Sequence, residues 1–137
     1  MAVARARRTT LAVPGSNPRM IAKAMGLPID ALFLDLEDAV SPLVKEEARA
    51  NVISALRDGD FGDRIVSVRI NARGTQWHQS DLSEVILQAG SHVDCIMVPK
   101  VHTADDVNTI AAELTALERE AGLAQGSIGL ELQIEDA

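Results

Sequence analysis

The sequence predicts an α/β protein in which helices cover a parallel sheet. Short segments alternate apolar and other residues with a period of two, which is typical of half-buried strands. Longer segments that open with helix-start signals separate them, and the two kinds follow one another strictly along the chain. Strands and helices in this order pair in parallel through right-handed crossovers. We expect one domain over residues 1–137.

The first two strand–helix units are marked by their turns. A short strand at Thr10–Val13 ends in a Pro-Gly turn, and the next helix begins with Asn17 as N-cap and Pro18 in the first helical position. The second strand lies in Leu32–Pro42, which reads LFLDLEDAVSP. Its leucines point to one face, and its Phe and acidic residues point to the other. The Ser-Pro pair that ends it predicts a second helix, to about residue 58.

The remaining strands follow the same pattern. We expect them in Arg64–Asn71, Asp94–Pro99 and Gly129–Glu135, with helices between them over about residues 81–88 and 103–121. Thr103, with Asp106 three residues later, forms a near capping box for the last helix. The chain therefore reads as (βα)₄β.

Three carboxylates, Asp35, Glu37 and Asp38, stand at the C-terminal end of the second strand. Removing a carboxylate from water costs several kcal/mol unless a cation or hydrogen bonds compensate. We therefore expect a positive group to face them. The candidates are a divalent cation and the guanidinium of Arg69, at the end of the third strand.

Both a barrel and an open doubly wound sheet fit (βα)₄β, but the polar strand faces favour a barrel. Strands covered by helices on both faces should be almost continuously apolar. In a (β/α)₈ barrel, functional residues gather at the C-terminal strand ends, where Glu37, Asp38, Arg69, Lys100 and Glu135 lie. Since five strands do not close such a barrel, we expect the N-terminal (βα)₄β part of a TIM (β/α)₈ barrel, incomplete as given, from a longer protein of about 250 or more residues.

Composition argues against several functions. The net charge of −7 and the low aromatic content, two Phe, one Trp and no Tyr, disfavour a nucleic-acid or anionic-membrane partner. The single cysteine, Cys95, excludes an internal disulfide, and its apolar surroundings predict a core residue. No stretch approaches the roughly 18 apolar residues of a membrane span, and the apolar run near the N-terminus is too short for a signal peptide. We expect a cytoplasmic protein.

Histidines and the lone tryptophan give weak signals. His78, His92 and His102 are scattered in predicted loops without ligand spacing, so we expect surface residues. Trp77 is expected to anchor a loop, with the wall of a ligand pocket as the alternative.

The acidic cluster has two interpretations. It could be a structural girdle of ion pairs inside the barrel, with Arg69 as partner. Alternatively, Glu37 or Asp38 together with Glu135 could hold Mg²⁺ through oxygen ligands, and Arg69 could stabilise developing enolate charge. Arg19 and Lys23, on one face of the first helix, fit either an anion site or a solvated helix face.

Short motifs run in one order through nearly the whole chain: RTTLAVPG at Arg8–Gly15, NPRM…KA at Asn17–Ala24, DLEDAV at Asp35–Val40, K…AR at Lys45–Arg49, VRIN at Val68–Asn71, VPK at Val98–Lys100 and QIE at Gln133–Glu135. In these motifs and their spacing the chain resembles the citrate lyase β-subunit and malyl-CoA lyase family, the CoA-ester lyases of the HpcH/HpaI aldolase superfamily.

The resemblance implies a Mg²⁺-dependent carbon–carbon lyase that acts next to a CoA thioester. By this resemblance, Arg69 corresponds to the family arginine that binds a substrate oxygen, and Glu135 corresponds to a metal ligand. Glu37 and Asp38 correspond to an acidic pair beside the metal. Arg19 and Lys23 correspond to residues that contact CoA phosphates. The implied partners are an acyl-CoA, a 2-keto acid such as glyoxylate, pyruvate or oxaloacetate, and further copies of the chain in a trimer or hexamer. The family's second metal ligand, an aspartate about one βα unit later, is absent from these residues, so we expect them alone to be inactive.

Two other functions remain open. A related metal-dependent aldolase would act on free 2-keto acids without CoA. A half barrel of 137 residues could instead be a non-catalytic subunit or fragment.

Overall fold

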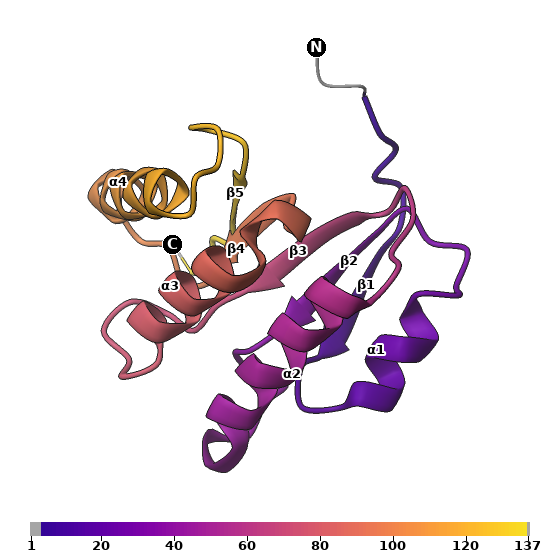
Figure 1. Cartoon of the computed structure of the whole chain (residues 1–137). Helices are drawn as coiled ribbons and strands as arrows, with labels where there is room; N and C mark the ends of the chain where they lie inside the picture. Colours follow the sequence, from indigo (N-terminus) through magenta and orange to yellow (C-terminus); the bar gives the residue numbers. More distant parts are fainter. Residues whose placement is uncertain (1–3, 137) are drawn as a thin grey trace.

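The computed structural model describes residues 4–136, and a five-stranded parallel sheet forms its centre (Figure 1). The strands are β1 (Thr10–Pro14), β2 (Ala31–Asp35), β3 (Ile65–Arg69), β4 (Cys95–Val98) and β5 (Gly129–Leu132). They lie side by side in chain order, each paired in parallel with the next. The predicted (βα)₄β arrangement is confirmed.

Helices connect the strands and cover one face of the sheet. They are α1 (Pro18–Ala24), α2 (Lys45–Asp58), α3 (His78–Ala89) and α4 (Ala104–Glu120), with single 3₁₀ turns η1 (Pro42–Val44) and η2 (Gly90–His92). Because successive strands are neighbours and such crossovers are right-handed, the helices fall on the same face, where α2 packs against α1 and α3, and α3 against α4. This order is that of successive units of a TIM barrel, since a doubly wound sheet reverses its strand order at a switch point.

The core lies between the sheet and the helices. Leu32, Leu34 and Leu36 point into it and are fully buried, as the alternation in this stretch predicts. The opposite face of the sheet carries Phe33 and polar side chains from β2, β3 and β5. The face of the sheet that meets the helices is therefore apolar, and the opposite face carries polar and charged side chains.

The predicted helix caps are mostly confirmed. The Asn17 side chain accepts a hydrogen bond from the Met20 N–H at 3.1 Å, and Thr103 and Asp106 form a complete capping box. Ser41, however, caps only the 3₁₀ turn η1, so α2 begins at Lys45.

Other boundaries differ by a few residues. Helix α3 begins at His78, earlier than predicted, and β5 ends at Leu132, earlier than the alternating pattern. Backbone pairing continues past β5, because the Gln133 N–H donates to the Val98 carbonyl at 2.9 Å.

Burial confirms the expectation for Cys95 and corrects one histidine. Cys95 is buried, and His92 and His102 are exposed as predicted. The surface prediction is wrong for His78, which is buried at the start of α3 and donates from Nδ1 to the Asn71 carbonyl at 2.9 Å. No helix in the described part of the chain is long and apolar enough to cross a membrane.

Candidate functional site

The C-terminal strand ends carry a cluster of charged side chains. Asp35 ends β2 and stands in register with Arg69, which ends β3. Lys100 follows β4, and Glu135 follows β5. Parallel strands in chain order bring these ends to one edge of the sheet, as predicted for a barrel.

The best-ordered part of the cluster is the Asp35–Arg69 ion pair. Nε and Nη2 of Arg69 donate to the two carboxylate oxygens of Asp35, both at 2.7 Å. Asp35 also accepts from the backbone N–H of Glu37 at 2.8 Å and of Ala39 at 2.9 Å. Burial alone would raise the pKa of Asp35, but the bonds from Arg69 and from these N–H groups together lower it. Asp35 therefore stays ionised and fixes the guanidinium.

Arg69 is not the partner of Glu37 and Asp38, because that partner is Lys100. Lys100 Nζ lies 3.0 Å from Glu37 Oε1 and 3.4 Å from Asp38 Oδ1. Glu37 is buried, and its Oε2 has no hydrogen-bond partner among the described residues. Burial and the neighbouring Asp38 raise the pKa of Glu37, whereas the neighbouring Glu37 and the Lys100 ammonium lower the pKa of Asp38. The pKa values of the two carboxyl groups are therefore shifted in opposite directions.

Lys45, from α2, holds the backbone beneath this acidic pair. Its Nζ donates to the carbonyl oxygens of Leu36 at 2.9 Å and Glu37 at 2.6 Å, and it lies 5.3 Å from the centre of the Trp77 ring. Burial lowers the pKa of Lys45. A buried ammonium therefore fixes the turn that carries Glu37.

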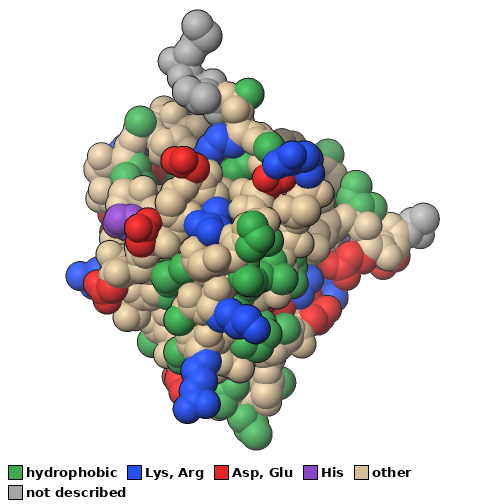
Figure 2. Space-filling model, turned by 90° about the vertical axis from the view of Figure 1, so that its right-hand side faces the viewer, with side chains coloured by type: hydrophobic (Ala, Val, Ile, Leu, Met, Phe, Trp, Pro, Cys, Tyr) green, Lys and Arg blue, Asp and Glu red, His purple; other side chains and the backbone are tan. Residues whose placement is uncertain are grey.

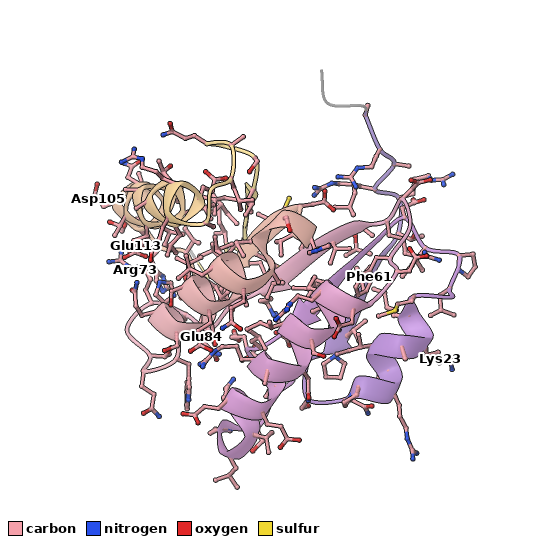
Figure 3. The ribbon with its side chains drawn as sticks, viewed as in Figure 1. Lys23, Phe61, Arg73, Glu84, Asp105 and Glu113 are labelled. Carbon is pink, nitrogen blue, oxygen red and sulfur yellow. The ribbon has the colours of Figure 1, made fainter. Side chains whose placement is uncertain are left out.

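A buried polar network behind β3 supports the same turn. Asn71 Nδ2 donates to the Leu36 carbonyl at 2.8 Å and to Asp81 Oδ2 at 2.6 Å, and Asp81 accepts from Arg49 Nε at 2.9 Å. Arg49 also contacts Glu84 on α3, which Figure 3 labels. Sequence reasoning missed this network. The sequence did contain one indication of the network, because Asp81 lies on the apolar face of α3, four residues before the buried Val85.

Glu135 joins the cluster from the segment after β5. Its Oε1 accepts from the Lys100 backbone N–H at 3.4 Å, and its side chain is exposed. Two residues earlier, Gln133 Oε1 lies 3.4 Å from Arg69 Nη1. Lys100 therefore contacts all three predicted residues, Glu37 and Asp38 through Nζ and Glu135 through its backbone N–H. Their roles stay predictions.

Arg19 and Lys23 are not brought to this cluster by any contact. Both are exposed on α1, and neither side chain forms a hydrogen bond or ion pair with another residue in the range 4–136. Lys23 points outward from α1, away from the sheet (Figure 3). On the face of the molecule that carries α1, basic side chains lie around a patch of hydrophobic ones (Figure 2).

The carboxylates suit Mg²⁺ in kind. Glu37, Asp38 and Glu135 offer hard oxygen ligands, and the unpaired Glu37 Oε2 is a buried acceptor without a donor. Within the described range, however, no three His, Cys, Asp or Glu side chains are grouped closely enough to hold a metal ion. Because Mg²⁺ often takes only one or two carboxylates and keeps water ligands, the residues fit an open site and not one closed by protein ligands.

Comparison with known proteins gives the family. The chain is 41% identical over 134 residues to the L-malyl-CoA/beta-methylmalyl-CoA lyase of Cereibacter sphaeroides. The aligned region covers 98% of this chain and 42% of that protein. The chain is 39% identical over 131 residues to the citrate lyase subunit beta of Escherichia coli K12, covering 96% of this chain and again 42% of the relative. The chain thus spans about two fifths of the length of these relatives.

Solved structures share the fold of this chain. The fold matches Haloferax volcanii malate synthase, in its magnesium/glyoxylate complex, with a TM-score of 0.85 at 22% identity, over 95% of this chain and 43% of that one. Protein CitE of Mycobacterium tuberculosis, solved with magnesium and acetate, is 35% identical with a TM-score of 0.60, over 74% of this chain and 40% of that one. A profile of the HpcH/HpaI aldolase/citrate lyase family matches residues 8–137, and the chain belongs to this family.

Proposed function

We propose that the C-terminal edge of this sheet is part of the active site of a Mg²⁺-dependent CoA-ester lyase. The reaction would make or break a carbon–carbon bond between an acyl-CoA enolate and a 2-keto acid, with a malyl-CoA, citramalyl-CoA or citryl-CoA type of substrate. Two relatives at about 40% identity carry lyase names of this kind, which supports the reaction class. The charged strand ends supply residues that suit it.

The observation that carries the proposal is the fixed guanidinium of Arg69. Asp35 accepts from one N–H each of Nε and Nη2, and Gln133 accepts from Nη1, so the second N–H groups of Nη1 and Nη2 remain for another acceptor. A donor held in place before the reaction stabilises charge on an enolate oxygen without reorganisation. Arg69 would thus bind the substrate oxygen on which negative charge develops.

Glu37 and Asp38 are the proposed acid–base pair. The raised pKa of Glu37 lets its carboxyl group keep a proton at higher pH than an ordinary glutamate, and its Oε2 has no competing partner in the described range. Asp38, with a lowered pKa, stays ionised beside it. Glu37 Oε2 is therefore the atom that we expect to hold or release a proton.

Glu135 is the proposed metal ligand, with Glu37 and Asp38 placed to orient water around the ion. Bound Mg²⁺ would polarise the keto and carboxylate oxygens of the acid. The magnesium in the CitE structure supports this choice of metal. Arg19 and Lys23, both exposed, are the proposed contacts for CoA phosphates. We also propose a cytoplasmic homo-oligomer, a trimer or hexamer.

One observation favours a second candidate. The matching family includes aldolases as well as citrate lyases, so a metal-dependent aldolase that uses free 2-keto acids without CoA is the alternative. Cleavage of a malyl-CoA substrate, compared with cleavage of a free 4-hydroxy-2-keto acid, separates the two.

A chimaera tests the lyase proposal. This chain replaces the matching 42% of the Cereibacter lyase, and release of glyoxylate from malyl-CoA is measured with and without Mg²⁺. We expect Mg²⁺-dependent cleavage that falls by about 10²-fold or more in Arg69→Met, the usual effect of removing one preorganised donor. A folded chimaera that keeps its full rate after Arg69→Met contradicts the proposal.

The 137 residues alone are expected to be inactive, because their described carboxylates do not complete a metal site. The non-catalytic half barrel shares this expectation, and the chimaera distinguishes them, since a merely structural half would not make cleavage depend on Arg69. Turnover by the isolated chain would overturn the expected inactivity.

A further inference from the structure

The backbone of Lys100 is strained. Among residues 4–136 it is the only non-glycine residue with a positive φ, at 52°, and it directly follows Pro99 at the end of β4. In this left-handed region the Cβ of an L-residue crowds a carbonyl oxygen, so a lysine adopts it only where other contacts compensate. Such strain gathers at ligand-binding and catalytic sites.

The conformation lets one residue reach acidic groups from two strand ends. Nζ contacts Glu37 and Asp38 at 3.0 and 3.4 Å, and the backbone N–H points at Glu135 Oε1 at 3.4 Å. An ammonium has three donors. Two of them face Glu37 and Asp38, and the third is left for a ligand.

Lys100 is also the most exposed of the three cations described at this edge. Lys45 is 6% exposed and donates to carbonyl groups, and the side chain of Arg69 is 14% exposed and occupied by Asp35. The side chain of Lys100 is 45% exposed. An anion that approaches the edge therefore meets Lys100 first.

The neighbouring Glu37 adds a second unused group. Its Oε2 is buried beside Lys100 and has no donor in the described range. This oxygen stays available for the proton that we propose it holds, and Lys100 can accept one more anion. We propose that Lys100 binds the carboxylate of a small 2-keto acid whose Mg²⁺ is held by Glu135, the proposed metal ligand, so that the site binds the acid and its cation together. This inference rests on the proposed function and adds a substrate-binding residue to it.

Calorimetric titration of the chimaera described under the proposed function tests the inference, with MgCl₂ alone and with sodium pyruvate in saturating Mg²⁺. Lys100→Met should weaken pyruvate binding by about tenfold or more, as expected for one hydrogen bond to a charged group. Mg²⁺ alone should bind equally or more tightly, because a repelling charge is removed. Lys100→Arg should restore part of the pyruvate affinity. Arg119→Met, which removes an exposed charge from the last turn of α4, should change neither affinity.

Lys100→Gly tests whether misfolding, and not loss of the ammonium, explains weaker pyruvate binding in Lys100→Met. It also removes the ammonium but relieves the left-handed backbone, so it should unfold about 2–4 °C above Lys100→Met and bind pyruvate equally weakly. If Lys100→Met binds pyruvate like the wild type, or if Arg119→Met loses as much affinity, the inference is overturned and the proposed function is not. If the wild-type chimaera binds neither Mg²⁺ nor pyruvate, both are overturned.

Discussion

Arg69 and Asp35 stand opposite each other in the ladder between β3 and β2 and form a two-point ion pair, with both N···O distances at 2.7 Å. The pair lies at the strand ends, where the core gives way to the charged cluster. It is nearly closed to solvent, since Asp35 is 1% exposed. One interaction therefore joins two strands and fixes the guanidinium for which we propose a role in substrate binding.

Asp35→Asn should destabilise the fold strongly. It leaves the guanidinium of Arg69 without its counter-ion, and removing one partner of a buried pair costs about 3–5 kcal/mol. Urea unfolding measures the loss. Asp63→Asn, at an exposed position between α2 and β3, makes the same chemical change and should stay within about 0.5 kcal/mol of the wild type. Equal stability of the two variants would show that the Asp35–Arg69 pair is energetically neutral.

The same pair predicts a pH dependence. The pKa of Asp35 is lower in the folded protein than its ordinary value of 3.8, so its contribution to stability is present above about pH 4 and is lost as the pH falls through the folded pKa. The difference in unfolding free energy between wild type and Asp35→Asn should therefore shrink in acid, by at most about 1.4 kcal/mol per pH unit. Glu37, whose pKa is raised, acts in the opposite direction, but it is present in both proteins and cancels in the difference. A difference that stays constant down to about pH 2 would refute the coupling.

Lys45→Met tests the support beneath Glu37. The Leu36 carbonyl keeps Asn71 as a donor and the Glu37 carbonyl keeps the Val40 N–H at 3.2 Å, but both lose a charged donor. We expect a loss of about 1.5–3 kcal/mol, as for hydrogen bonds to a charged group, partly offset because a buried ammonium is removed. Trp77 is the only tryptophan, so its fluorescence should change when the ammonium leaves its ring. Lys45→Arg, which keeps the charge, is the matched control, and unchanged stability and fluorescence in Lys45→Met would count against the support.

The periodic features of this fold were predictable from the sequence. Leu32, Leu34 and Leu36 alternate with Phe33 and Asp35, and a period of two places the leucines on one face wherever the strand lies in the sheet. Parallel pairing then brings the strand ends to one edge, so the meeting of their charged residues follows from topology.

The specific partners were not predictable in the same way. Glu37 contacts Lys100, 63 residues later, because the backbone after each strand decides which of the charged strand ends come within reach. Asp81 contacts Arg49, 32 residues earlier, because α2 packs against α3. His78 illustrates the same limit, since a polar residue at a helix start is usually exposed but here reaches the Asn71 carbonyl. The periodicity of the sequence predicts the strand or helix on which a residue lies, but its contact partner depends on tertiary packing.

Gly15 is required by the close approach of the β1–α1 turn to the end of β2. A Cβ at this position would lie 2.8 Å from the Asp35 carbonyl oxygen and 2.8 Å from Val52 Cγ2, and the Gly15 N–H donates to the same carbonyl at 2.8 Å. Backbone cannot yield as a flexible side chain does, so Gly15→Ala should cost about 1–3 kcal/mol by overpacking. The turn would move away from β2 and loosen the backbone at Asp35.

Gly26→Ala is the matched control, because the nearest atom to a Cβ there, the Lys23 carbonyl oxygen, is 3.8 Å away. This variant should match the wild type or gain up to about 1 kcal/mol through the smaller entropy of its unfolded chain. Chemical denaturation measures both variants, and amide exchange at Leu36, whose N–H donates to the Arg69 carbonyl at 2.9 Å, reports whether β2 and β3 separate. We expect faster exchange only in Gly15→Ala. Because the contact is made by the Asp35 backbone, a Gly15→Ala protein with wild-type stability and exchange would show that the turn can shift without disturbing the strand end that holds Arg69.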